Sequence, residues 1–89
     1  MLIDTVSQKE ISTIAALATG QSAIIHRVIG NSLGCSRLRE LGLTNGTAIR
    51  LLRQAPFGGP MVFELRGYQL CLRPSEARLV EINNAFPVT

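Results

Sequence analysis

Aromatic residues are scarce in this sequence, and tryptophan is absent. The four aromatic side chains are Phe57, Phe63, Tyr68 and Phe86. Signalling SH3 domains bind proline-rich peptides in a groove lined by several aromatic side chains. We expect Phe63 in the core, which leaves too few aromatic residues for such a groove. The sequence therefore argues against polyproline binding.

Residues that hold metal ions or carry out catalysis are also few. The sequence has one histidine, His26, and two cysteines, Cys35 and Cys71, and their spacing matches no metal motif such as C-x₂-C or H-x₃-H. The carboxylates are scattered, and neither a P-loop nor a dinucleotide fingerprint is present. We therefore expect no catalytic residue, no cofactor, no metal site and no enzymatic activity.

Signals for export or membrane insertion are missing as well. Residues 1–7 lack the basic start and the sustained apolar run of a signal peptide. No stretch approaches the ~20 apolar residues that cross a bilayer, and two cysteines do not make the disulfide framework of a small secreted domain. We expect a cytoplasmic protein with reduced thiols, peripheral to a membrane only through a partner.

The sequence does contain enough hydrophobic residues for one small core. Its 89 residues are 46% hydrophobic and 17% charged, which is typical of a single folded domain over residues 1–89. The net charge is +3, from eight arginines and one lysine interleaved with glutamates. Nucleic-acid-binding proteins usually concentrate their basic residues on one face. We interpret this pattern as a solvated, mildly basic surface and expect no nucleic-acid partner.

Two segments show a helical pattern. Residues 8–18 begin with capping-box spacing, carry apolar residues at helical spacing and end before Gly20. Residues 35–41 place Leu38 and Leu41 three positions apart, on one helix face. The sequence therefore predicts a short N-terminal helical segment and a short helix between the first two strands.

Elsewhere the hydrophobic pattern has the period of two that is typical of β-strands. Imperfect alternation in the first strand predicts a bulge. Five strands are expected, at residues 22–29, from 47 onward, and at 61–66, 70–73 and 80–82.

The segments after the third strand show turn and cap signals. Gly67 and Tyr68 are expected to form a tight turn, and residues 74–77 a single helical turn capped by Ser75. Residues 83–89 carry no pattern and are expected to be a frayed tail.

Short strands joined by short turns indicate an all-β fold, a small five-stranded antiparallel barrel over about residues 12–82. A barrel of this size is filled by its own side chains, so its function is expected on the outer surface. The predicted core consists of Ile25, Leu38, Leu41, Leu43, Ile49, Leu51, Phe63, Leu65, Leu70, Leu72, Val80 and Ile82.

Three motifs resemble one known family. Residues 37–47 read RLRELGLTNGT, residues 55–60 read APFGGP, and residues 70–82 contain LCLR, then Glu76–Ala77, then Val80 and Ile82. In this order and spacing, over about residues 14–82, they are similar to FeoA proteins of bacterial ferrous iron transport. Two departures are Asn45, where the family often has proline, and Cys71, where it often has alanine.

The resemblance implies an SH3-like barrel that acts as an accessory protein of ferrous iron uptake. It implies a protein partner, the cytoplasmic GTP-binding part of the FeoB permease. A similar domain ends some metal-dependent transcription repressors, so a nucleic-acid or transcription-related barrel is the alternative. The sequence leaves homo-oligomerisation open.

The candidate partner-binding residues come from the chemistry of one loop and one helix. The loop at 55–60 places Phe57 between prolines and glycines, and aromatic and arginine residues dominate interface hot spots. Either Phe57 contacts the partner or it folds back and plugs the barrel mouth, and the sequence does not decide between these. The predicted partner-binding residues are Arg37, Arg39, Phe57, Gly58, Gly59 and Pro60.

Overall fold

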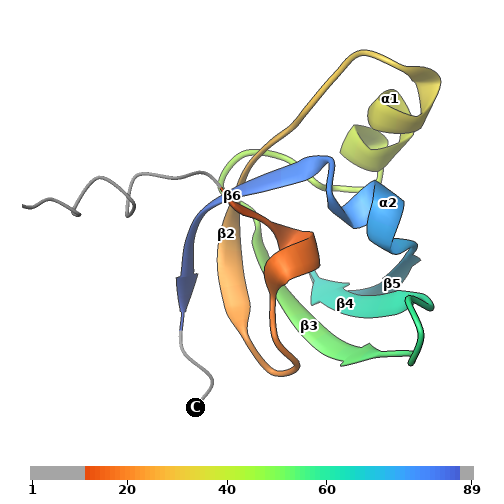
Figure 1. Cartoon of the computed structure of the whole chain (residues 1–89). Coiled ribbons are helices and arrows are strands. Elements are labelled where there is room, and N and C mark those ends of the chain that lie inside the picture. The colour runs from red at the N-terminus through yellow and green to blue at the C-terminus, as the bar shows by residue number, and fades with distance from the viewer. Residues whose placement is uncertain (1–11, 87–89) are drawn as a thin grey trace, which may run out of the picture.

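The computed structural model describes residues 12–86, which form an antiparallel sheet of six strands with short helical segments (Figure 1). The order of strands across the sheet is β1-β6-β2-β3-β4-β5. The elements are β1 (Ser12–Thr13), the 3₁₀ helix η2 (Ile14–Ala16), β2 (Ser22–Val28), α1 (Leu33–Glu40), β3 (Ala48–Gln54), β4 (Met61–Leu65), β5 (Tyr68–Leu72), α2 (Pro74–Ala77) and β6 (Val80–Phe86). The five longer strands are those expected, and β1 adds a short sixth.

The sheet curves into a barrel whose edge strands are β1 and β5. Each edge strand leads directly into a short helix, β1 into η2 and β5 into α2, and these two helices contact one another. Helix packing thus brings the two edges together. The register of β2 against β6 shifts between Ala23 and Ile25 and again between Ile25 and Arg27, which confirms the expected bulge.

One hydrophobic core fills the barrel, and most of the predicted core residues belong to it. Leu41 is an exception: it is 37% exposed, because α1 ends at Glu40 and Leu41 is its C-cap residue. Leu70 is only partly buried against the core. The confirmed core residues are Ile25, Leu38, Leu43, Ile49, Leu51, Phe63, Leu65, Leu72, Val80 and Ile82.

Both ends of the described chain differ from the expectation. Within residues 12–18 a two-residue strand and η2 replace the expected helix, because Ser12 and Thr13 pair with β6. The remainder of that expected helix lies outside the described residues. At the other end, residues 83–86 are not a frayed tail but continue β6, where Ala85 pairs with Ala23. Residues 87–89 of the expected tail lie outside the described residues. Backbone ladders, which need no alternation of side chains, determine the structure at both ends.

Two turns also differ in detail. The turn between β4 and β5 is formed by Arg66 and Gly67, with φ of 48° and 83°, and Tyr68 is already in β5. The N-cap of α2 is Arg73 rather than Ser75. The backbone N–H of Arg73 donates to Oε1 of Glu76 at 2.8 Å, which satisfies a donor at the helix start.

No helix in residues 12–86 combines the length and the apolar character needed to cross a bilayer.

Candidate functional site

The loop between β3 and β4, residues 55–60, is a turn at one end of the barrel that two backbone hydrogen bonds close. The N–H of Ala55 donates to the carbonyl of Pro60 at 2.9 Å, and the N–H of Gly59 donates to the carbonyl of Pro56 at 3.2 Å. Phe57 and Gly58 occupy the two central positions with φ of 59° and 73°. This is a type I′ geometry, in which both central residues have positive φ.

Phe57 at the tip of this loop is fully exposed, with a relative exposure of 103%. It therefore does not plug the barrel mouth, which was one of the two positions the sequence allowed. Positive φ is unfavourable for a bulky side chain and costs about 1–3 kcal/mol. A large apolar side chain is thus held in water on a strained backbone, an arrangement that its own packing does not explain.

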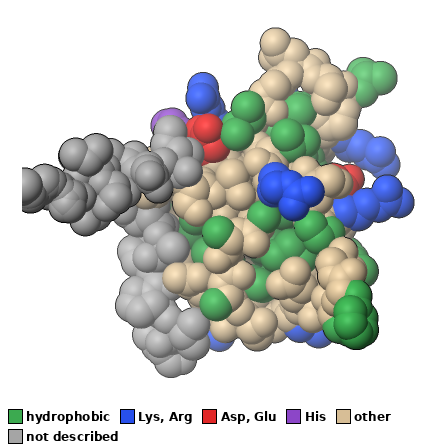
Figure 2. Space-filling view, in the orientation of Figure 1, with side chains coloured by type: hydrophobic (Ala, Val, Ile, Leu, Met, Phe, Trp, Pro, Cys, Tyr) green, Lys and Arg blue, Asp and Glu red, His purple; other side chains and the backbone are tan. Residues whose placement is uncertain are grey.

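A cavity of about 440 Å³ lies directly beside the loop. Gly58, Gly59 and Pro60 line one side. The other side belongs to α2 and its flanks and consists of Arg73, Pro74, Ser75 and Arg78. In Figure 2, hydrophobic side chains project at the lower right, where Figure 1 places this loop. No pattern in the sequence points to Arg73 and Arg78, which are distant from the loop along the chain.

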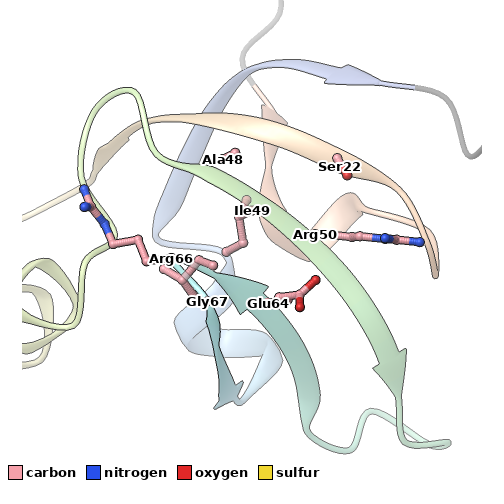
Figure 3. A pocket seen from close by; sticks show the side chains of 8 residues that line it. Ser22, Ala48, Ile49, Arg50, Glu64, Arg66 and Gly67 are labelled. Atoms are coloured by element: carbon pink, nitrogen blue, oxygen red, sulfur yellow. The ribbon is translucent and has the colours of Figure 1, made fainter.

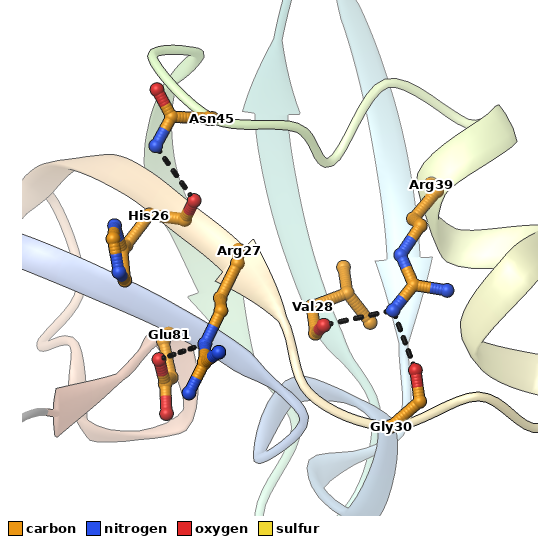
Figure 4. Close-up of polar contacts among 7 residues, drawn as sticks. All are labelled: His26, Arg27, Val28, Gly30, Arg39, Asn45 and Glu81. Carbon is orange, nitrogen blue, oxygen red and sulfur yellow. Dashed lines mark hydrogen bonds and ion pairs between the residues drawn. The ribbon is translucent and has the colours of Figure 1, made fainter.

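The predicted arginines of α1 do not adjoin this loop. Figure 1 places α1 at the top of the molecule and the β3–β4 loop at the lower right, with α2 between them. Arg37 is exposed and lines a separate pocket between α1 and β5. Arg39 is half-buried, and its Nη2 donates to the carbonyls of Val28, at 3.0 Å, and Gly30 (Figure 4). Arg39 thus ties α1 to the end of β2.

The histidine and the two cysteines, the usual soft metal ligands, lie apart on different elements. The thiol of Cys35 is buried and donates to the carbonyl of Ile29 at 3.0 Å, whereas Cys71 is exposed on β5. His26 is half-buried on β2, and its carbonyl accepts from Nδ2 of Asn45 at 2.8 Å (Figure 4). Within the described part of the chain, no group of three histidine, cysteine or acidic side chains is placed to hold a metal ion.

One ion pair connects β2 and β6. Arg27 Nε donates to Oε1 of Glu81 at 2.8 Å, and the two residues are partners in the strand register (Figure 4). Glu81 is buried, whereas the Arg27 side chain is mostly exposed. The hydrogen bond and the charge of Glu81 raise the pKa of Arg27 above its usual range. This pair links two neighbouring strands of the sheet, and neither residue belongs to the 55–60 loop.

A second hollow, of about 300 Å³, lies over β3 and β4 (Figure 3). Arg50 and Glu64 are cross-strand partners there, and their side chains flank its opening. Arg66 points away from them and donates to Oγ1 of Thr47 at 2.9 Å. Because Arg66 points away from Arg50 and Glu64, the three charged groups that line this hollow do not converge on one point.

A family model described as FeoA domain matches residues 12–84. A fusion protein of Fe(2+) transport protein A and the Fe(2+) transporter FeoB from Porphyromonas gingivalis is 30% identical over 69 residues. That alignment covers 78% of this chain and 8% of the fusion protein's length.

Solved structures share the same architecture. The zinc complex of FeoA from Stenotrophomonas maltophilia, described as a procaryotic SH3 domain protein, has a TM-score of 0.77 and 29% identity over 86% of this chain and 98% of that one. A manganese-dependent transcriptional repressor has a TM-score of 0.74 over 85% of this chain and 42% of that one. At 13% identity, the repressor shares the fold alone.

Proposed function

Because the chain belongs to the FeoA family, we propose that it is a cytoplasmic accessory protein of ferrous iron uptake that binds the GTP-binding part of a FeoB permease. The observation that carries this proposal is the fusion protein, in which a relative of this chain and FeoB are one polypeptide. Covalent linkage keeps two modules at a high effective concentration, which favours a contact between them.

The barrel itself supports a binding role rather than a catalytic one. Its interior is filled by large side chains such as Phe63, Leu51 and Met61, all fully buried. Function then falls to the outer surface, where shape and charge select a partner. We propose that the protein acts on the permease by contact and performs no chemistry of its own.

We propose that Phe57, Gly58, Gly59 and Pro60 form the contact surface for this partner. Phe57 is fully exposed and the loop is held by two internal hydrogen bonds. Prolines at both ends further limit the conformations of the free loop, so little entropy is lost when it binds. An exposed aromatic side chain on a rigid loop has the features of an interface hot spot.

The two arginines on α1, Arg37 and Arg39, have different roles in this proposal. Arg37 is free to contact a second region of the partner, away from the loop. Arg39 is committed to the carbonyls of Val28 and Gly30, and we propose that it supports α1 instead of contacting the partner directly.

The test is binding of the purified chain to the cytoplasmic GTP-binding domain of FeoB from the same organism, in its GTP-analogue, GDP and nucleotide-free states. Phe57→Ser should weaken the affinity by about 30-fold, the value for a 2 kcal/mol hot spot. Its Tm should be nearly unchanged, because Phe57 has no packing to lose.

Leu33→Ser is the matched control. Leu33 is also an exposed large apolar residue, at 88%, but it lies on α1 at the other end of the molecule. Its affinity should stay within about twofold of the unchanged chain. If Phe57→Ser is folded and retains both full binding and full iron uptake in cells, the loop is not the contact surface. If the unchanged chain binds the domain in none of the three states, the proposed function is wrong.

A further inference from the structure

Resting on the proposed function, we propose that the 55–60 loop recognises an acidic protein surface beside an apolar recess. The phenyl ring of Phe57 enters the recess, and carboxylates of the partner occupy the cavity between the loop and α2. Arg73 and Arg78 contact those carboxylates.

The cavity is positively charged because its two ionisable lining residues are both arginines. Arg73 and Arg78 are exposed, and neither side chain forms an ion pair with any residue whose side chain the structure describes. The nearest acidic residue in sequence, Glu76, lines the pocket on the other side of α2, and its carboxylate accepts from the backbone of Arg73. The cavity therefore has a positive electrostatic potential, since no acidic side chain lines it.

The geometry of the cavity suits carboxylates. The planar guanidinium of arginine presents parallel N–H donors that match both oxygens of a carboxylate. Gly58 and Gly59 form the facing wall, and a Cβ on Gly58 would stand in open space, so its absence leaves room for a partner group to approach the loop backbone.

The apolar half of the surface is continuous with the charged half. Phe57 immediately precedes the glycines that line the cavity, and Pro56 and Pro60 flank the tip. A partner that buries Phe57 thus brings its neighbouring residues against Arg73 and Arg78. The combination selects an apolar recess rimmed by acidic residues, since charge complementarity sets which partners approach productively.

These features favour a protein over a nucleic acid. Nucleic-acid binding relies on many basic residues along one face. The positive side chains visible in Figure 2 stand at separate places around the molecule instead of in a single stripe. A single projecting phenyl ring with two arginines is a small surface, suited to one protein pocket.

The experiment measures affinity for the FeoB cytoplasmic domain with Arg73 and Arg78 both changed to Glu, at about 50 and 300 mM NaCl. The double reversal should weaken binding by at least tenfold at the lower salt concentration. Affinity of the unchanged chain should fall as salt rises, because exposed charges are screened. The double change to Lys keeps both charges but loses the paired guanidinium donors, so it should weaken binding by less than the double Glu change does.

Arg50→Glu is the control for charge alone, since Arg50 is an exposed arginine on β3 that lines the separate hollow beside Glu64. It should change the affinity by less than about twofold. The inference is overturned if the unchanged chain binds the domain and the double Glu variant, with an unchanged Tm, binds within twofold of it. That result leaves the proposed function standing.

Two other results also decide the matter. If the unchanged chain does not bind the domain at either salt concentration, the proposed function fails and this inference fails with it. Tight binding of a 20-base-pair DNA duplex at 150 mM salt, abolished by the same double Glu variant, would assign the surface to nucleic acid and overturn the choice of a protein.

Discussion

Gly59 lies so close to Ala55 across the neck of the β3–β4 loop that a Cβ on Gly59 would stand 2.7 Å from the Cβ of Ala55. The same atom would lie 3.2 Å from the carbonyl oxygen of Pro56. Contacts this short force the backbone apart. Glycine at this position is therefore required by space, and it allows the loop to close through the hydrogen bond between Ala55 and Pro60.

Gly59→Ala should destabilise the domain by about 1–3 kcal/mol, the usual cost of overpacking. Thermal unfolding measures this, with an expected fall in Tm of several degrees for a domain of this size. Adding Ala55→Gly removes the closest atom and should restore part of the loss. Gly34→Ala is the control, because its added Cβ would meet only ordinary contacts and lies in α1. An unchanged Tm for Gly59→Ala would show that the loop opens without cost.

The core residue Leu72 should be far more sensitive than an exposed leucine. Leu72 is 3% exposed and Leu33 is 88% exposed. Leu72→Ala should cost about 2–5 kcal/mol, a large share of the stability of a small domain. Leu33→Ala should stay within about 0.5 kcal/mol. Urea unfolding followed by circular dichroism compares the two, and equal midpoints would contradict this core assignment.

Arg39 is expected to affect stability and not partner recognition. Arg39→Met keeps the aliphatic stem but removes the hydrogen bonds to the carbonyls of Val28 and Gly30. Bonds from a charged donor contribute about 1.5–3 kcal/mol, and the exposed Gly30 carbonyl places this one near the lower value. Arg37→Met, on the same helix, should change stability by less than about 0.5 kcal/mol. If Arg39→Met is as stable as the unchanged chain yet binds FeoB weakly, Arg39 is a contact residue.

The parts of this fold that the sequence predicts well are those in which side chains decide the structure. Alternation at Phe63 and Leu65 and the pair Leu70 and Leu72 identified two strands, because one face of each is buried. Residues 83–86 were missed, since their strand is held by backbone pairing with β2 and has no hydrophobic pattern. Leu41 was misplaced because a helix can end one residue before an apolar position.

The candidate site was predictable only in part, for a related reason. The sequence located the 55–60 loop through its prolines and glycines, which restrict the backbone locally. It does not reveal that Arg73 and Arg78 lie beside this loop, because only the fold brings α2 and its flanking residues there. Arg39 stays a predicted contact residue, and the sequence does not reveal that its guanidinium donates to the carbonyls of Val28 and Gly30.

Replacing Phe57 by asparagine should change stability and partner binding in opposite directions. The substitution relieves the strained backbone but removes the exposed aromatic ring. Asparagine tolerates positive φ far better than phenylalanine, and Asn followed by Gly is the preferred pair in a type I′ turn. Phe57→Asn places asparagine directly before Gly58, at φ of 59°. The fully exposed ring contributes no packing that the substitution would remove. We therefore expect the free energy of unfolding to rise by about 1 kcal/mol and Tm to rise by several degrees.

The same substitution should weaken binding to the FeoB domain by about 30-fold, because the ring is the proposed anchor. Phe57→Tyr is the control, since it keeps both the aromatic ring and the strained backbone and should leave stability and binding nearly unchanged. If Phe57 served folding, its replacement by asparagine would lower the stability of the domain. If Phe57 serves partner contact, the same replacement raises the stability of the domain and weakens binding to FeoB. A fall in Tm together with intact binding would contradict both the strain at Phe57 and its role as the anchor.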